Sequence, residues 1–119
     1  MSSRTHLTIL RSYIYSLACR ILRIYIYGMR YTFDPAKAAA NLAKHGVSFD
    51  AINGFEWEMA FVEADTRHNE PRLIAVAPTG DRVHVLVYTV ERRSVRLISL
   101  RKANDKEIDR YEASLPPEH

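Results

Sequence analysis

The stretch RLIAVAPTGDRVHVLVYTVERRSVRLISLR, residues 72–101, decides the fold. Its β-branched and aromatic residues form three runs, at 72–77, 83–90 and 95–101, which the turn-forming groups Pro-Thr-Gly-Asp and Glu-Arg-Arg-Ser separate. Short loops of this kind join antiparallel neighbours, so the runs predict a β-meander. The middle run is apolar at nearly every position, which is typical of a central strand covered on both faces, and its His84 therefore needs a partner or an edge.

Signals for helices lie on both sides of this meander. Asp34 and Pro35 are a helix-entry pair, and the Ala-rich residues 36–44 continue that helix towards Gly46. The other expected elements are a strand directly after Met29, a second helix over residues 49–57 capped by Ser48, a strand at 60–63, and a last helix opened by Asn104 and Glu107. The order β-α-α-β-β-β-β-α predicts an α+β fold, a small antiparallel sheet packed with helices.

Length and composition favour one compact domain in a reducing compartment. The chain has 119 residues, of which 47% are hydrophobic, so it is too short for a multidomain enzyme and too apolar for a disordered chain. Its single cysteine, Cys19, can form no intramolecular disulfide and no zinc site alone. We therefore expect a cytoplasmic protein.

The first 28 residues differ from the rest of the chain. They carry four arginines and no acid, whereas residues 29–119 have a net charge of −1. Apolar residues recur at helical spacing there, but the longest charge-free run within that stripe, residues 12–19, is too short to cross a membrane, and the arginines spoil a signal-peptide pattern. A membrane-surface helix, a partner-binding helix and an extension from an upstream start codon remain open. We favour the extension, because a complete domain over residues 29–119 can begin at Met29.

Cationic and polar residues are the remaining candidates for chemistry. The sequence has no metal-ligand spacing, no phosphate-binding glycine loop and no nucleophile with a partnered base, so we expect neither cofactor nor metal. Lys44 and His45 are also explained as charges at a helix end, and a Glu70–Arg72 pair as an ordinary surface contact. The two-residue period places Arg96 and Arg101 on opposite faces of their strand, which argues against one pocket that uses both.

Two segments carry a resemblance to a known family. Residues 30–49, with the spacing Asn-x-x-Lys-His-Gly, resemble the opening of the BrnT family, and residues 96–104, with Arg-x-Ile-Ser-x-Arg, resemble its closing half. These are ribonuclease toxins of bacterial type II toxin–antitoxin pairs with a RelE-like fold, and the resemblance extends from residue 30 to about residue 113. Leu100 departs from the pattern, since the family more often has a small residue there; we expect crowding beside Arg101.

The resemblance implies metal-independent RNA cleavage by attack of a 2′-hydroxyl on the neighbouring phosphate. Arg72 and Arg101 are then the candidate phosphate clamps, because a guanidinium matches phosphate oxygens in a bidentate way. Glu70 or His45 is the candidate base, and His45 is the acid if Glu70 is the base. The candidate substrate-binding residues are Lys44, Ser99 and Tyr111. Tyr111 is a stacking residue or, by its helical spacing, part of the core.

The resemblance also implies a protein partner. A BrnA-like ribbon-helix-helix antitoxin would cover the cationic face, and operator DNA would be reached only through that antitoxin. Two other function classes stay open at this stage. One is a non-catalytic RNA- or protein-binding module on the same fold, and the other is a membrane-surface protein anchored by residues 1–28 without stable insertion.

Overall fold

A computed structural model describes residues 29–116, so the helix expected within residues 1–28 lies outside the described part. The elements are, in order, β1 (Arg30–Thr32), α2 (Pro35–His45), the 3-10 helices η1 (Phe49–Gly54) and η2 (Trp57–Met59), β2 (Phe61–Asp65), β3 (Arg72–Thr79), β4 (Arg82–Glu91), β5 (Ser94–Lys102) and α3 (Asp105–Ser114). One sheet has the strand order β1-β5-β4-β3-β2. Strand β1 runs parallel to β5, and the other neighbours are antiparallel, which confirms the α+β class and the meander.

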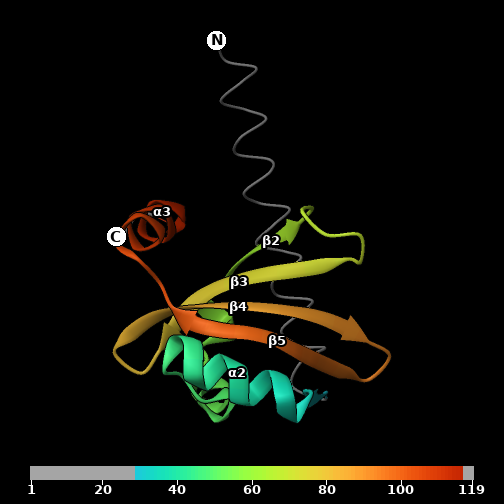
Figure 1. Cartoon of the computed structure of the whole chain (residues 1–119). Helices are drawn as coiled ribbons and strands as arrows, with labels where there is room; N and C mark the ends of the chain where they lie inside the picture. The colour runs from blue at the N-terminus through green and yellow to red at the C-terminus, as the bar shows by residue number, and fades with distance from the viewer. Residues whose placement is uncertain (1–28, 117–119) are drawn as a thin grey trace.

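The sheet has a core face and an outer face. Figure 1 shows α2 on one side of the sheet and α3 on the other. The core face packs against α2, η1 and η2, and its centre is an aromatic cluster in which Trp57 meets Phe55 and Tyr88 edge to face. The buried strand residues of this face are Ala75, Ala77, Leu86, Tyr88, Val95, Leu97 and Leu100.

Helix α2 begins and ends where the sequence predicts. The Asp34 carboxylate accepts a hydrogen bond of 2.9 Å from the Ala36 amide, and Pro35 stands in the first turn. Gly46 ends the helix with a positive φ of 70°, a conformation that a glycine adopts without strain. His84 also finds a partner, because its Nδ1 lies 2.9 Å from the Arg82 carbonyl oxygen.

The second predicted helix differs in kind. Residues 49–57 form no α-helix; η1 and η2 follow one another as short 3-10 turns, although Ser48 caps η1 as expected, with its Oγ 3.1 Å from the Asp50 amide. Phe55 between them is extended and forms an isolated bridge with Thr79. Gly54 weakens a helix. The extended backbone at Phe55 lets Phe55 and Trp57, two residues apart, both enter the core.

A β-bulge in β5 overturns the predicted placement of two arginines. Val87 of β4 pairs with Ser99, but the next residue of β4 pairs with Leu97, so Ile98 is an extra residue on β5. The bulge inverts the alternation, and Leu97 and Leu100 both face the core. Arg96 and Arg101 therefore share the outer face instead of pointing apart.

Candidate functional site

The outer face of the sheet carries a polar cluster at the start of β3. Arg72 donates to Oε1 of Glu70 from Nε at 3.0 Å and from Nη2 at 2.8 Å, so the two residues meet as the sequence predicted. Arg96 extends the cluster, with its Nη2 3.4 Å from the other carboxylate oxygen of Glu70. The hydrogen bond from Arg72 is the main reason that the pKa of Glu70 is lowered, which makes this carboxylate a weaker base.

Arg101 lies near the other end of β5, where it is tied to helix α3. Its Nη1 and Nη2 donate to the two carboxylate oxygens of Glu107 at 2.8 and 2.7 Å, a bidentate pair. Glu107 also accepts from the Asn104 amide at 2.9 Å, and its own amide donates to the Asn104 side chain at 2.8 Å. The predicted capping box is thus present, and it fixes the carboxylate that orients Arg101.

Asn41 holds the end of α2 against the same part of β5. Its buried side-chain amide donates to the carbonyl oxygens of Leu100 at 2.8 Å and Val47 at 2.9 Å, and its Oδ1 accepts from the Leu100 amide at 3.1 Å. Strand β1 pairs only with Ser94–Arg96, so the Asn41 amide takes the place of a neighbouring strand further along β5. This contact brings the last turn of α2 to the end of β5 where Arg101 stands.

His45 occupies that last turn together with Lys44. Burial is the largest cause of the lowered pKa of His45, and the positive charges of Lys44 and Arg101 lower it further. At neutral pH the neutral form of His45 is therefore favoured, and this form can accept a proton. Among the described residues no hydrogen bond joins the imidazole to Arg101; the Asn41 contact with Leu100 is what places the last turn of α2 beside the end of β5.

Ser99 and Tyr111 have different surroundings. Ser99 is half-buried opposite Val87, on the stretch of β5 between Arg96 and Arg101. Tyr111 is buried on α3, where its hydroxyl donates to the Met59 carbonyl oxygen at 2.7 Å and burial raises its pKa. This hydrogen bond ties α3 to the segment before β2. Tyr111 also lines the cavity between α3 and the outer face of the sheet, so its role in stacking stays a prediction.

Five of the seven predicted site residues thus fall into two groups, one at the start of β3 and one where the last turn of α2 meets the end of β5. Glu70 and Arg72 form the first, and Lys44, His45 and Arg101 form the second. The sheet register puts Arg101 level with Val76, four residues beyond Arg72 along β3, which corresponds to about 13 Å. Within the described residues, no hydrogen bond joins the two groups. A long substrate can touch both, but one proton-transfer step can use only one of them.

Leu100 does not crowd Arg101. The leucine side chain is fully buried in the core on the face opposite the arginine, and Arg101 keeps its bidentate pair. The sequence reasoning treated Glu107 only as a cap and set Arg96 apart from Arg101. The Arg101–Glu107 pair could have been predicted, because a capping glutamate follows the arginine by six residues. The bulge at Ile98, which brings Arg96 and Arg101 to one face, has no signal in the residue pattern.

Comparison with known families matches residues 33–107, more than half of the chain, to the ribonuclease toxin, BrnT, of type II toxin-antitoxin system. The chain belongs to the BrnT family. Among solved structures it resembles the 1.1 Å crystal structure of the Brucella abortus ribonuclease toxin, BrnT, with a TM-score of 0.51 and 23% identity. That match covers 65% of this chain and 99% of the other, and it supports a shared fold. A comparison with curated proteins gave no match.

The BrnT family consists of ribonuclease toxins that act within type II toxin–antitoxin systems, so an antitoxin partner and an RNA substrate belong to its biology. No helix among residues 29–116 has the length and apolar character needed to span a membrane. The same described residues contain no cluster of three His, Cys, Asp or Glu side chains able to hold a metal ion.

Proposed function

We propose that this protein is an endoribonuclease toxin whose reaction centre is the group formed by His45, Lys44 and Arg101. The observation that supports the proposal is the contact of Asn41 with Leu100, which holds the last turn of α2, with Lys44 and His45, beside the strand end that carries Arg101. The lowered pKa of His45 favours its neutral form, and the Arg101 side chain is partly exposed. A base and a cation are what attack by a 2′-hydroxyl requires. Glu70 is the weaker candidate base, since its two arginine neighbours stabilise the ionised carboxylate.

The proposed reaction assigns a role to each of these residues. Neutral His45 takes the proton of the 2′-hydroxyl while the 2′-oxygen bonds to the adjacent phosphorus. The bond from phosphorus to the 5′-oxygen of the next nucleotide breaks, and solvent supplies the proton for that oxygen. Arg101 stabilises the charge that grows on the phosphate oxygens, and Lys44 adds a second charge. Arg72, with Ser99 between the two groups, holds a more distant part of the RNA backbone.

Arg101→Ala tests this centre. We expect the variant to fold and to lose about 10²–10³-fold in rate on a model RNA, the loss typical of one removed charge-stabilising donor. The substrate control is the same RNA with 2′-deoxy sugars, which lacks the nucleophile and should stay intact. A variant that cleaves RNA at the wild-type rate would remove Arg101 from the centre, and a wild-type protein that binds RNA without cleaving it would favour the binding-module alternative.

The partner proposal is a BrnA-like ribbon-helix-helix antitoxin that covers the arginines of the outer face. Expression of this chain alone should arrest growth, and co-expression of such a protein should relieve the arrest. Binding of the antitoxin, measured by co-purification, should survive Arg101→Ala, because several arginines contribute to the covered face. Operator DNA would then be bound by the antitoxin, with this chain attached through it.

A further inference from the structure

A cavity of about 430 Å³ lies between the outer face of the sheet and helix α3. Its floor is apolar and is formed by Ile74 and Val76 of β3 with Val85 and Val87 of β4. This volume is in the range of small-ligand sites. Among the residues placed in the reaction centre, Arg101 alone lines the cavity, so the two sites adjoin and share one guanidinium.

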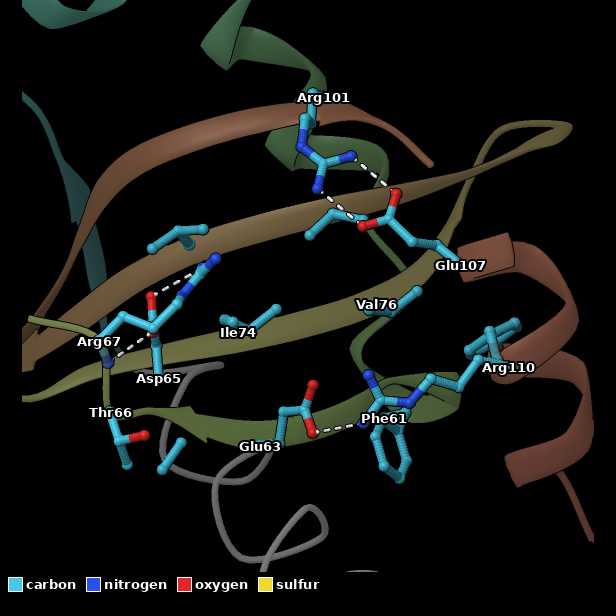
Figure 2. A pocket seen from close by; sticks show the side chains of 14 residues that line it. Phe61, Glu63, Asp65, Thr66, Arg67, Ile74, Val76, Arg101, Glu107 and Arg110 are labelled. Atoms are coloured by element: carbon cyan, nitrogen blue, oxygen red, sulfur yellow. Dashed lines mark hydrogen bonds and ion pairs between the residues drawn. The ribbon is translucent and has the colours of Figure 1, made fainter. Parts of the chain in front are cut away.

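Three ion pairs stand around this floor, as Figure 2 shows. Arg67 binds Asp65 at 2.9 Å, Arg110 binds Glu63 at 2.9 Å, and Arg101 binds Glu107 at 2.7 Å. Arg67 and Arg110 are the open members of the rim, with side chains 73% and 69% exposed. The three arginines keep guanidinium hydrogens for an incoming group, and the partly exposed carboxylates of Glu63 and Glu107 keep lone pairs for it, whereas the Asp65 carboxylate is buried.

The chemistry of floor and rim favours a flat, neutral group that both donates and accepts hydrogen bonds. A phosphate fits poorly over the floor itself, because four aliphatic side chains form it and the two exposed rim arginines, Arg67 and Arg110, each face a carboxylate. A nucleobase fits, since its face can lie on aliphatic side chains and its edge carries both donors and acceptors. Arginine planes at the rim can also stack on an unstacked base.

We propose that this cavity binds one unstacked nucleobase of the RNA, next to the phosphate held by Arg101. The inference deepens the proposed function and rests on it, because it assigns the nucleotide beside the reaction centre to a defined subsite. The sugar and phosphate of that nucleotide would then lie beside Arg101. Binding of the base in the subsite would therefore decide which phosphodiester linkage of the RNA lies next to His45. The ion-paired rim then contributes to base preference, and the apolar floor contributes to affinity.

Binding of a 2′-O-methyl RNA, which resists attack, tests the subsite independently of cleavage. The probe is a fluorescent oligonucleotide in which one position at a time is abasic. For the wild-type protein we expect one abasic position to weaken binding about tenfold, the usual contribution of a bound base. Val87→Phe places a larger side chain in the cavity. The variant protein should bind the intact oligonucleotide as weakly as the wild-type protein binds the abasic one, and removal of the base at that position should not weaken its binding further. Val90→Phe, the same change at an exposed site of β4, is the matched control.

Arg110→Ala is a second variant, for use if Val87→Phe does not fold. The Arg110 side chain is exposed and pairs only with Glu63 at the rim, so we expect this variant to fold. It should weaken binding of the intact oligonucleotide severalfold and leave binding of the abasic one unchanged. Equal abasic effects in wild type and in the folded variants would overturn the subsite. Unchanged RNA binding with lost antitoxin binding would assign the cavity to a protein partner and overturn it as well. RNA that binds as expected but is never cleaved would overturn the proposed function alone.

Discussion

At the scale of single residues, His45 carries the prediction that pH tests. Burial, Lys44 and Arg101 hold the pKa of its imidazole below the usual 6.5, so the base form persists into mildly acidic solution. The cleavage rate should rise with pH through that lowered pKa and level off near neutrality. His45→Gln should lower the rate and abolish this rise of the rate with pH, as a rate profile from about pH 5 to pH 9 would show.

Lys44→Met is the matched variant for the pH profile. It removes one of the two charges that lower the pKa of His45, so the rising part of the pH profile should move to higher pH, and the plateau should fall because a phosphate-stabilising charge is lost. If the rise of the rate with pH persists in His45→Gln and is lost in Glu70→Gln, Glu70 is the residue that accepts the proton.

Asp65 provides a stability test at the same scale. Its carboxylate is 2% exposed and accepts three hydrogen bonds from Arg67, which lower its pKa to about 2. The unfolded chain takes up this proton at higher pH than the native protein does, so the stabilisation is complete above about pH 4 and is lost as the pH falls towards 2. Urea melts across this window should show a shallower slope for Asp65→Asn. Arg67→Gln should flatten the slope too, and an unchanged slope in both variants would contradict the assignment.

At the scale of elements, Asn41 joins α2 to β5. Asn41→Ala leaves three backbone groups, the amide and carbonyl of Leu100 and the carbonyl of Val47, without their side-chain partner, and these buried groups should cost about 2–3 kcal/mol of unfolding free energy or more. The control is Asn53→Ala, whose exposed side chain makes a single 3.1 Å bond to the Asp50 carbonyl oxygen. That change should stay within about 0.5 kcal/mol. Equal denaturation midpoints for the two variants would show that the docking of α2 depends on other contacts.

The elements also show what the sequence could and could not predict. Helix α2 was predictable because Asp34, Pro35 and Gly46 act locally on the backbone, and the meander was predictable because two turns separate apolar runs. The change of residues 49–57 into 3-10 turns depends on core aromatic contacts between distant elements, which no local signal records. The bulge at Ile98 inverts the face of every later residue of β5, so one local irregularity changed the relation of Arg96 to Arg101.

At the scale of the whole molecule, charge is divided between two parts of the chain. Residues 1–28 have a net charge of +4, and residues 29–119 have −1. For the proposed RNA binding, the described part would therefore depend on the arginines of the outer face rather than on net charge. If residues 1–28 also touch RNA, they would add a salt-dependent term to affinity without altering which linkage is cut.

The last prediction concerns a variant that begins at Met29. Its sheet is complete from β1, where the Arg30 amide donates to the Arg93 carbonyl oxygen at 3.1 Å, and Met29 and Tyr31 already pack against the buried core. We therefore expect the variant to unfold cooperatively at a Tm within a few degrees of the full chain, with the same cleavage products. Its RNA affinity should fall less steeply with salt, because four arginines are gone. Thermal melts and salt titrations of both proteins provide the measurement, and loss of the cooperative transition would place residues 1–28 in the fold.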